Sequence, residues 1–149
     1  MQTPFYVSGF LYNPKTNQIL LVQSRSETDQ SLWSTMEEED VEGEEAVVIF
    51  KRIINKLLNL DLKPKDIYPV YDYLHNTRNK FNYVFYAEVK NIKRFNHLKN
   101  GNLTWFTFNE ALKLPLTSQI KRDIVVGERV INAKKRDIEA KKLFNSLTS

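Results

Sequence analysis

The densest group of residues able to bind a metal ion lies between Glu37 and Glu45, where seven of nine residues are acidic. Carboxylate oxygens are the ligands that hard divalent cations such as Mg²⁺ and Ca²⁺ prefer. The next fifteen residues, Ala46 to Leu60, contain no acid at all. We predict as candidate cation ligands the four acids that alternate along this stretch: Glu38, Asp40, Glu42 and Glu44.

Two interpretations of the acidic stretch are open. In the first, the loop itself forms a cation site, because Glu38, Asp40, Glu42 and Gly43 resemble the opening of a calcium-binding loop. The twelfth position of such a loop supplies a bidentate glutamate, but it is Ile49 here, which weakens the likeness. In the second, the acids only precede a helix. Each acid then interacts favourably with the positive N-terminal end of the helix dipole, which stabilises the helix by about 0.3–1 kcal/mol.

The rest of the chain is basic. All 22 lysines and arginines lie outside the acidic stretch, against only eleven of the eighteen acids. A basic surface around one negative patch favours a phosphate-bearing small ligand, or more weakly a nucleic acid. The alternative interpretation is that the charges have no specific role and form an ordinary solvated surface with one acidic loop.

Other broad classes are excluded by composition. The chain has no cysteine, so neither disulfides nor thiolate metal sites can form. No apolar run reaches the roughly 18 residues of a membrane span, and the first residues lack a basic segment before an apolar one. We therefore expect a cytoplasmic protein without a membrane partner. No pattern indicates an oligomeric state.

The elements that must position these residues form an α/β pattern in one expected domain of 149 residues. A mixed sheet with helices packed on it is the physical expectation. A helix is predicted from about Glu44 to Leu58, and a long C-terminal helix from about 117 to 145. On the latter, Ile120, Ile124, Ile131 and Ile138 form an apolar stripe, although its turns beyond Arg136 are harder to bury. The predicted strands are Phe5–Tyr12, Gln18–Ser24, 67–75, 81–89 and 103–108.

The order of these elements resembles that of the Nudix hydrolases, whose signature is G-x5-E-x7-R-E-U-x-E-E-x-G-U, with U an aliphatic residue. An ungapped alignment places Glu38 at the first glycine, Glu44 at the first glutamate and Arg52 at the arginine. Ile54, Asn59 and Leu60 take the first aliphatic, closing glycine and last aliphatic positions. The resemblance runs from about Phe5 to Ile124. It implies a Nudix-like α/β/α sandwich with a mixed sheet and, for an active member, Mg²⁺ or Mn²⁺.

The helical part of the signature departs from the family. Residues three and four apart share one helical face, and the family's glutamates there hold the metal. The equivalent positions here are Ile53, Lys56 and Leu57, none of which binds a hard cation. We predict instead that Ile53 and Leu57 are substantially buried, in a packing stripe with Ala46 and Phe50.

The resemblance therefore implies a Nudix-fold protein that binds a nucleotide or other diphosphate-containing ligand, with weak or no hydrolysis. Glu44 is the candidate catalytic residue, and Arg25, Trp33 and Arg52 are candidate ligand contacts. The alternatives are an active metal-dependent pyrophosphohydrolase with a site rebuilt from the acidic loop, and a protein-interaction module. Tyr71 and Tyr73 are of the type that stacks on a base but are more typical of a core, and His75 is interpreted as a surface histidine.

Overall fold

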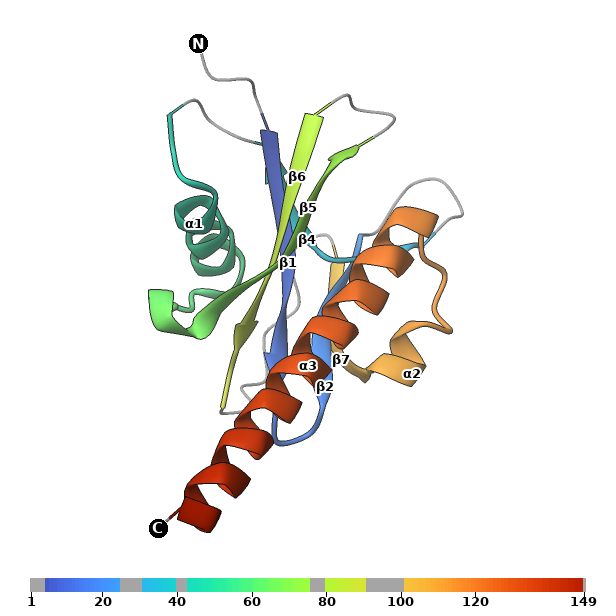
Figure 1. Cartoon of the computed structure of the whole chain (residues 1–149). Coiled ribbons are helices and arrows are strands. Elements are labelled where there is room, and N and C mark those ends of the chain that lie inside the picture. The colour runs from blue at the N-terminus through green and yellow to red at the C-terminus, as the bar shows by residue number, and fades with distance from the viewer. Residues whose placement is uncertain (1–4, 25–30, 40–42, 76–79, 91–100, 149) are drawn as a thin grey trace.

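The computed structural model describes residues 5–24, 31–39, 43–75, 80–90 and 101–148. A seven-stranded mixed sheet lies between helix α1 on one face and the long helix α3 on the other (Figure 1). The elements in chain order are β1 (Phe5–Asn13), β2 (Gln18–Ser24), β3 (Trp33–Ser34), β4 (Met36–Glu39), α1 (Ala46–Leu58), the 3₁₀ turn η1 (Pro64–Asp66), β5 (Ile67–His75), β6 (Lys80–Glu88), β7 (Gly101–Thr107), α2 (Phe108–Ala111) and α3 (Ser118–Thr148).

Strand β1 is the centre of the sheet. It runs parallel to β6 on one side, and on the other it pairs antiparallel with β4 along its first half and with β2 at its end. β5 forms an edge next to β6, and β7 pairs with β2. Parallel pairs are found with both faces covered, and β1 is accordingly apolar or buried along almost its whole length.

Alternate residues of β1 face the two helices. Val7 and Leu11 pack in the core beneath α1, whereas Phe10 and Tyr12 pack in the core beneath α3. This alternation follows from the period of two along a strand. It also means that Ser8, between Val7 and Gly9, faces the α3 side, where the polar groups described below collect.

The acidic stretch is not wholly a loop, which corrects our prediction. Its first residues belong to β4, where Glu37 is paired with Ser8 of β1 and Glu38 with Val7. Glutamate has a low intrinsic preference for strands, but pairing with a neighbouring strand outweighs that preference. Asp40 and Glu42 lie outside the described residues.

Helix α1 begins at Ala46, two residues later than predicted, and ends at Leu58. Asn59 then adopts a left-handed conformation, φ 52°, as residues that end helices often do. The prediction for Ile53 is confirmed, because its side chain is 2% exposed in the core beneath α1. Leu57 is only partly buried against the same core.

Helix α3 extends past the end of the sheet (Figure 1). Thr117 accepts a hydrogen bond from the backbone N–H of Ile120 and so caps its start. Ile124 and Ile131 are buried as predicted, but Ile138 is 44% exposed because no sheet lies beneath the last turns. Among the described residues, every helix is too short or too polar to cross a membrane.

Candidate functional site

The predicted catalytic residue, Glu44, lies just before α1 and is bound to Arg52 of that helix. Both carboxylate oxygens of Glu44 accept hydrogen bonds from Arg52 Nη1, each at 2.6 Å. Arg52 Nη2 lies 3.7 Å from Glu38 of β4. The three side chains are about one-third exposed, so each pair contributes only about 0–1 kcal/mol to stability. The structure thus brings together three of the predicted site residues.

This cluster does not offer the donor set of a Nudix metal centre. Ile53 is buried in the core, Lys56 is an exposed cation and Leu57 packs against apolar groups. Within the described part of the chain, no three His, Asp or Glu side chains are grouped to hold a metal ion. Two of the four predicted ligands, Glu38 and Glu44, already contact an arginine. The described residues therefore do not fit Mg²⁺ or Mn²⁺.

The other predicted ligand contacts are dispersed. Arg25 lies outside the described residues. Trp33 is in β3, where its ring meets Phe106 edge-on with centroids 4.9 Å apart, and its backbone N–H donates to the Pro115 carbonyl at 3.0 Å. Trp33 is not among the residues that line the pocket described next.

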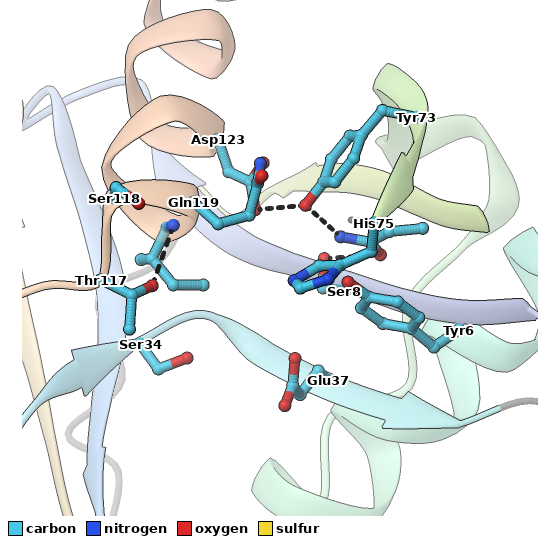
Figure 2. A pocket seen from close by; sticks show the side chains of 12 residues that line it. Tyr6, Ser8, Ser34, Glu37, Tyr73, His75, Thr117, Ser118, Gln119 and Asp123 are labelled. Carbon is cyan, nitrogen blue, oxygen red and sulfur yellow. Dashed lines mark hydrogen bonds between the residues drawn. The ribbon is translucent and has the colours of Figure 1, made fainter. Parts of the chain in front are cut away.

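A polar pocket of about 370 Å³ opens between the sheet and the first turns of α3. Figure 2 shows Ser34 and Glu37 on one side of it and Tyr73 and His75 on the other, with Asp123 of α3 above. Strands β1, β3, β4, β5 and β6 and the start of α3 all contribute to its lining. The lining residues are Tyr6, Ser8, Ser34, Glu37, Tyr73, His75, Asn82, Thr117, Ser118, Gln119, Ile120 and Asp123.

A chain of hydrogen bonds joins the sheet to Asp123, which is 0% exposed. Ser8 Oγ donates to Asn82 Oδ1 at 3.1 Å, and Asn82 Nδ2 donates to the Tyr73 hydroxyl at 2.7 Å. The Tyr73 hydroxyl donates to Asp123 Oδ2 at 3.3 Å. Asp123 Oδ1 also accepts hydrogen bonds from Tyr71, at 2.6 Å, and Gln119, at 3.2 Å. A buried carboxylate is expensive unless such donors satisfy it.

The electrostatics of this network follow from its burial. Burial raises the pKa of the Asp123 carboxyl above its ordinary range, and the hydrogen bonds from Tyr71, Gln119 and Tyr73 oppose that shift. Burial also raises the pKa of the Tyr71 and Tyr73 hydroxyls, which therefore keep their protons at neutral pH. Because they stay O–H donors, the direction of the hydrogen bonds around Asp123 is fixed. The network can orient a ligand with little rearrangement.

The sequence pointed to the Glu44 cluster and missed this pocket. Asp123 was not singled out, although an acid directly beside Ile124 and three residues after Ile120 falls on the buried face of a helix. That position is the only local signal. His75 was interpreted as a surface residue, but it is half-buried and lines the pocket, with its ring 5.6 Å from that of Tyr6.

No protein-family model matches the sequence, and no curated protein matches it either. Solved structures do match. A mutT/nudix family protein from Listeria innocua superposes with a TM-score of 0.71 at 18% identity, over 90% of this chain and 97% of that one. The NUDIX domain of Shewanella oneidensis NrtR, complexed with ADP ribose, gives 0.68 at 14% identity, over 88% and 90%.

A third similar structure is the C-terminal domain of mouse MUTYH in complex with human PCNA, with a TM-score of 0.65 at 12% identity, over 88% of this chain and 91% of that one. Identities this low bear on the fold alone. The chain has the Nudix-like α/β fold, with a mixed sheet and a long C-terminal helix, and the predicted fold class is confirmed.

Proposed function

We propose that this protein binds a nucleotide or another diphosphate-containing ligand and hydrolyses it weakly or not at all. The burial of Ile53 carries the second part, because a helix position that would hold a metal-binding glutamate is committed to the core. Diphosphate hydrolysis of this class relies on cations that clamp the phosphates and activate water. Without helical carboxylates, the described residues do not provide such a clamp.

Ligand binding is supported by the pocket and by the fold. The volume of the pocket, about 370 Å³, falls within the range of roughly 300–1,000 Å³ that is usual for small-molecule sites. A similar fold, the NUDIX domain of NrtR, was solved with ADP ribose. We propose Arg25, Trp33 and Arg52 as ligand contacts, with the two arginines as contacts to phosphate. A cytoplasmic location and a phosphate-bearing partner belong to this proposal, and a nucleic acid is the weaker candidate partner.

Two alternatives each have one observation in their favour. Glu44 is retained at the position of the family's first glutamate, which favours an active pyrophosphohydrolase that uses Mg²⁺ or Mn²⁺. Such a site would need Glu44 to exchange Arg52 for a cation. The other alternative, a protein-interaction module, is favoured by three exposed apolar side chains near the end of α3, Leu143, Phe144 and Leu147. A similar fold, the MUTYH domain, was solved with a protein partner.

Calorimetric titration with ADP-ribose, first without a divalent cation and then with Mg²⁺ or Mn²⁺, tests the proposal. We expect binding that does not require the cation. Arg52→Gln should weaken it roughly tenfold, because it removes a charge-assisted phosphate contact and leaves Glu44 unpaired. Lys51→Gln, one residue away and paired with the exposed Asp61, is the matched control and should bind as the parent does. No heat with ADP-ribose or with nucleoside diphosphates would refute the proposal.

A further inference from the structure

The end of helix α3 carries the three most exposed large apolar side chains among the described residues. Leu143, Phe144 and Leu147 are 62%, 66% and 77% exposed. Together with Ala140 they follow the spacing i, i+3, i+4 and i+7, which places them on one face of a helix. The turns that carry them project beyond the end of the sheet (Figure 1). A contiguous apolar face of this kind indicates an interaction site, whereas isolated apolar residues on a surface do not.

This apolar face points away from the body of the domain. On the other side of the helix, Ile131 is buried in the core, and one turn later Lys134 Nζ lies 3.3 Å from Glu88 of β6. Ile138 continues the Ile131 side of the helix, and Leu147 lies nine residues further along. At about 100° per residue, these nine residues turn Leu147 roughly 180° away from Ile138. The body of the domain therefore does not obstruct a surface that approaches the apolar face.

The same outward side of α3 is basic further back along the helix. Arg129 and Arg136 are exposed, and they precede Leu143 at intervals of seven residues, or about 10.5 Å. Seven residues are close to two whole turns, so the three side chains lie nearly in line. Beyond Ile131 the helix carries five bases and only two acids. The chemistry that complements this side of α3 is a negatively charged surface with an apolar interior within reach.

Charge and shape together favour a flat anionic surface over a second copy of the chain. Two copies that met along the outward sides of α3 would bring Arg129 and Arg136 of each against those of the other. Two copies that met only at the apolar ends would share three large side chains each, whereas a stable interface takes about 20–30 residues a side.

A flat surface also uses the bases better than an acidic groove in a protein does. A groove would contact only the bases at its rim. A charged plane also attracts Lys141 and Lys142, which lie on the body side of the helix. These lysines are no further from the plane than the diameter of the helix, about 10–12 Å, which is close to the Debye length of about 10 Å at 0.1 M salt.

We propose that α3 docks this protein on an anionic lipid surface. Leu143, Phe144 and Leu147 enter the boundary between headgroups and acyl chains, while Arg129 and Arg136 contact lipid phosphates. Helices with leucine and phenylalanine on one face and lysine on the other bind membranes in this way. A cytoplasmic location is compatible with this docking, because the leaflet that faces the cytoplasm carries anionic lipids.

This docking differs from the expectation of no membrane partner, which rested on the lack of a membrane-spanning run. A helix that lies in the interface does not span the bilayer. The docking is therefore compatible with the finding that no described helix is long and apolar enough to cross a membrane. It does not depend on the proposed nucleotide ligand, since none of these side chains lines the pocket.

Co-sedimentation with vesicles tests the docking. The full chain, without nucleotide, would be mixed with phosphatidylcholine vesicles that contain about 30% phosphatidylglycerol and with vesicles of phosphatidylcholine alone, at about 0.1 M NaCl. We expect binding to the anionic vesicles, binding at least about tenfold weaker to the neutral ones, and loss of binding at about 1 M NaCl, where charges are screened. No binding to the anionic vesicles, or equal binding to both kinds, would overturn the proposal.

A variant of the apolar face tests whether these side chains enter the lipid. Leu143→Gln, Phe144→Gln and Leu147→Gln combined should weaken binding at least about tenfold, because three apolar side chains no longer insert. The three residues are exposed, so the far-UV circular dichroism should stay that of the parent. Ile138→Gln, on the body side of the same helix and 44% exposed in the parent, is the control and should bind as the parent does. Parent-like binding of the triple variant would refute the proposal.

A second pair of variants tests the charge contribution. Lys141→Gln combined with Lys142→Gln should weaken binding to the anionic vesicles about tenfold. Lys51→Gln combined with Lys56→Gln removes the same charge from α1, on the other face of the sheet, and should change binding little. If both double variants weaken binding equally, net charge and not α3 attracts the vesicles, and the proposal fails. A dimer in analytical ultracentrifugation that the triple variant abolishes would assign the apolar face to a second copy and would also overturn the proposal.

Discussion

Ile53→Glu restores a carboxylate at one of the helix positions where Nudix hydrolases hold a metal ion, and it should destabilise the protein strongly. Ile53 is 2% exposed and packs in the core with Phe50 and Ile54. Loss of a fully buried isoleucine costs about 1.5–3 kcal/mol, and a carboxyl group without partners adds about 1–3 kcal/mol even if it stays neutral. The total, about 2.5–6 kcal/mol, is a large part of the free energy of unfolding of a typical domain, which is roughly 5–15 kcal/mol.

Thermal unfolding measures this directly. For a chain of this size each kcal/mol lowers Tm by about 2–4 °C, so a decrease on the order of 10–20 °C is expected. Lys56→Glu is the matched control, because it restores another family glutamate at an exposed position of the same helix. It should stay within about 0.5 kcal/mol of the parent. A parent-like Tm for Ile53→Glu would show that this face of α1 is open, and our account of the missing metal site would be wrong.

Two further predictions concern the pocket and the sheet. Because burial raises the native pKa of Asp123, the native state binds a proton more readily than the unfolded state, and the free energy of unfolding should fall as pH rises from about 4 through the raised native pKa. Urea unfolding of the parent and of Asp123→Asn would be measured across this pH window. The free energy of unfolding of the parent should fall relative to that of Asp123→Asn as pH rises, and a difference that does not change with pH would contradict a raised pKa of Asp123. Gly9→Ala should destabilise the chain by several kcal/mol, since its Cβ would overlap the backbone oxygen of Phe85 and lie 2.5 Å from the Phe50 ring. Urea unfolding would reveal this, and a parent-like midpoint would show that β1 and β6 can separate.

The sequence predicted α1 and α3 well because each carries a long apolar stripe at helical spacing. The apolar stripe on α1 identified Ile53 as a core residue and so located the position at which the chain departs from the family signature. The stripe on α3 also includes Ile138, which is exposed, in line with the expectation that the turns beyond Arg136 are hard to bury. Spacing alone does not reveal where the sheet ends beneath the helix. Strand β4 was missed for a related reason, since Glu37 and Glu38 take strand conformation only through their pairing with β1.

The pocket could not be predicted from local patterns. Ser8 and Asn82 are 74 residues apart, and Tyr71 and Asp123 are 52 apart, so their contacts depend on the order of the strands and on where α3 crosses them. A single acid on a helix is normally solvated, and only its place beside Ile124 distinguished Asp123. The Glu44–Arg52 pair, by contrast, is eight residues apart and was accessible through the family signature.

The central claim, binding without efficient hydrolysis, is tested most directly by measuring phosphate or nucleotide release from ADP-ribose, NADH, dinucleoside polyphosphates and nucleoside triphosphates. The parent and Glu44→Gln would be assayed side by side with Mg²⁺ and with Mn²⁺. Because the described part of α1 lacks metal-binding carboxylates, we predict release near the uncatalysed background for both proteins and both cations. Robust turnover by the parent that Glu44→Gln abolishes would contradict the account and would establish a metal site rebuilt around the acidic stretch.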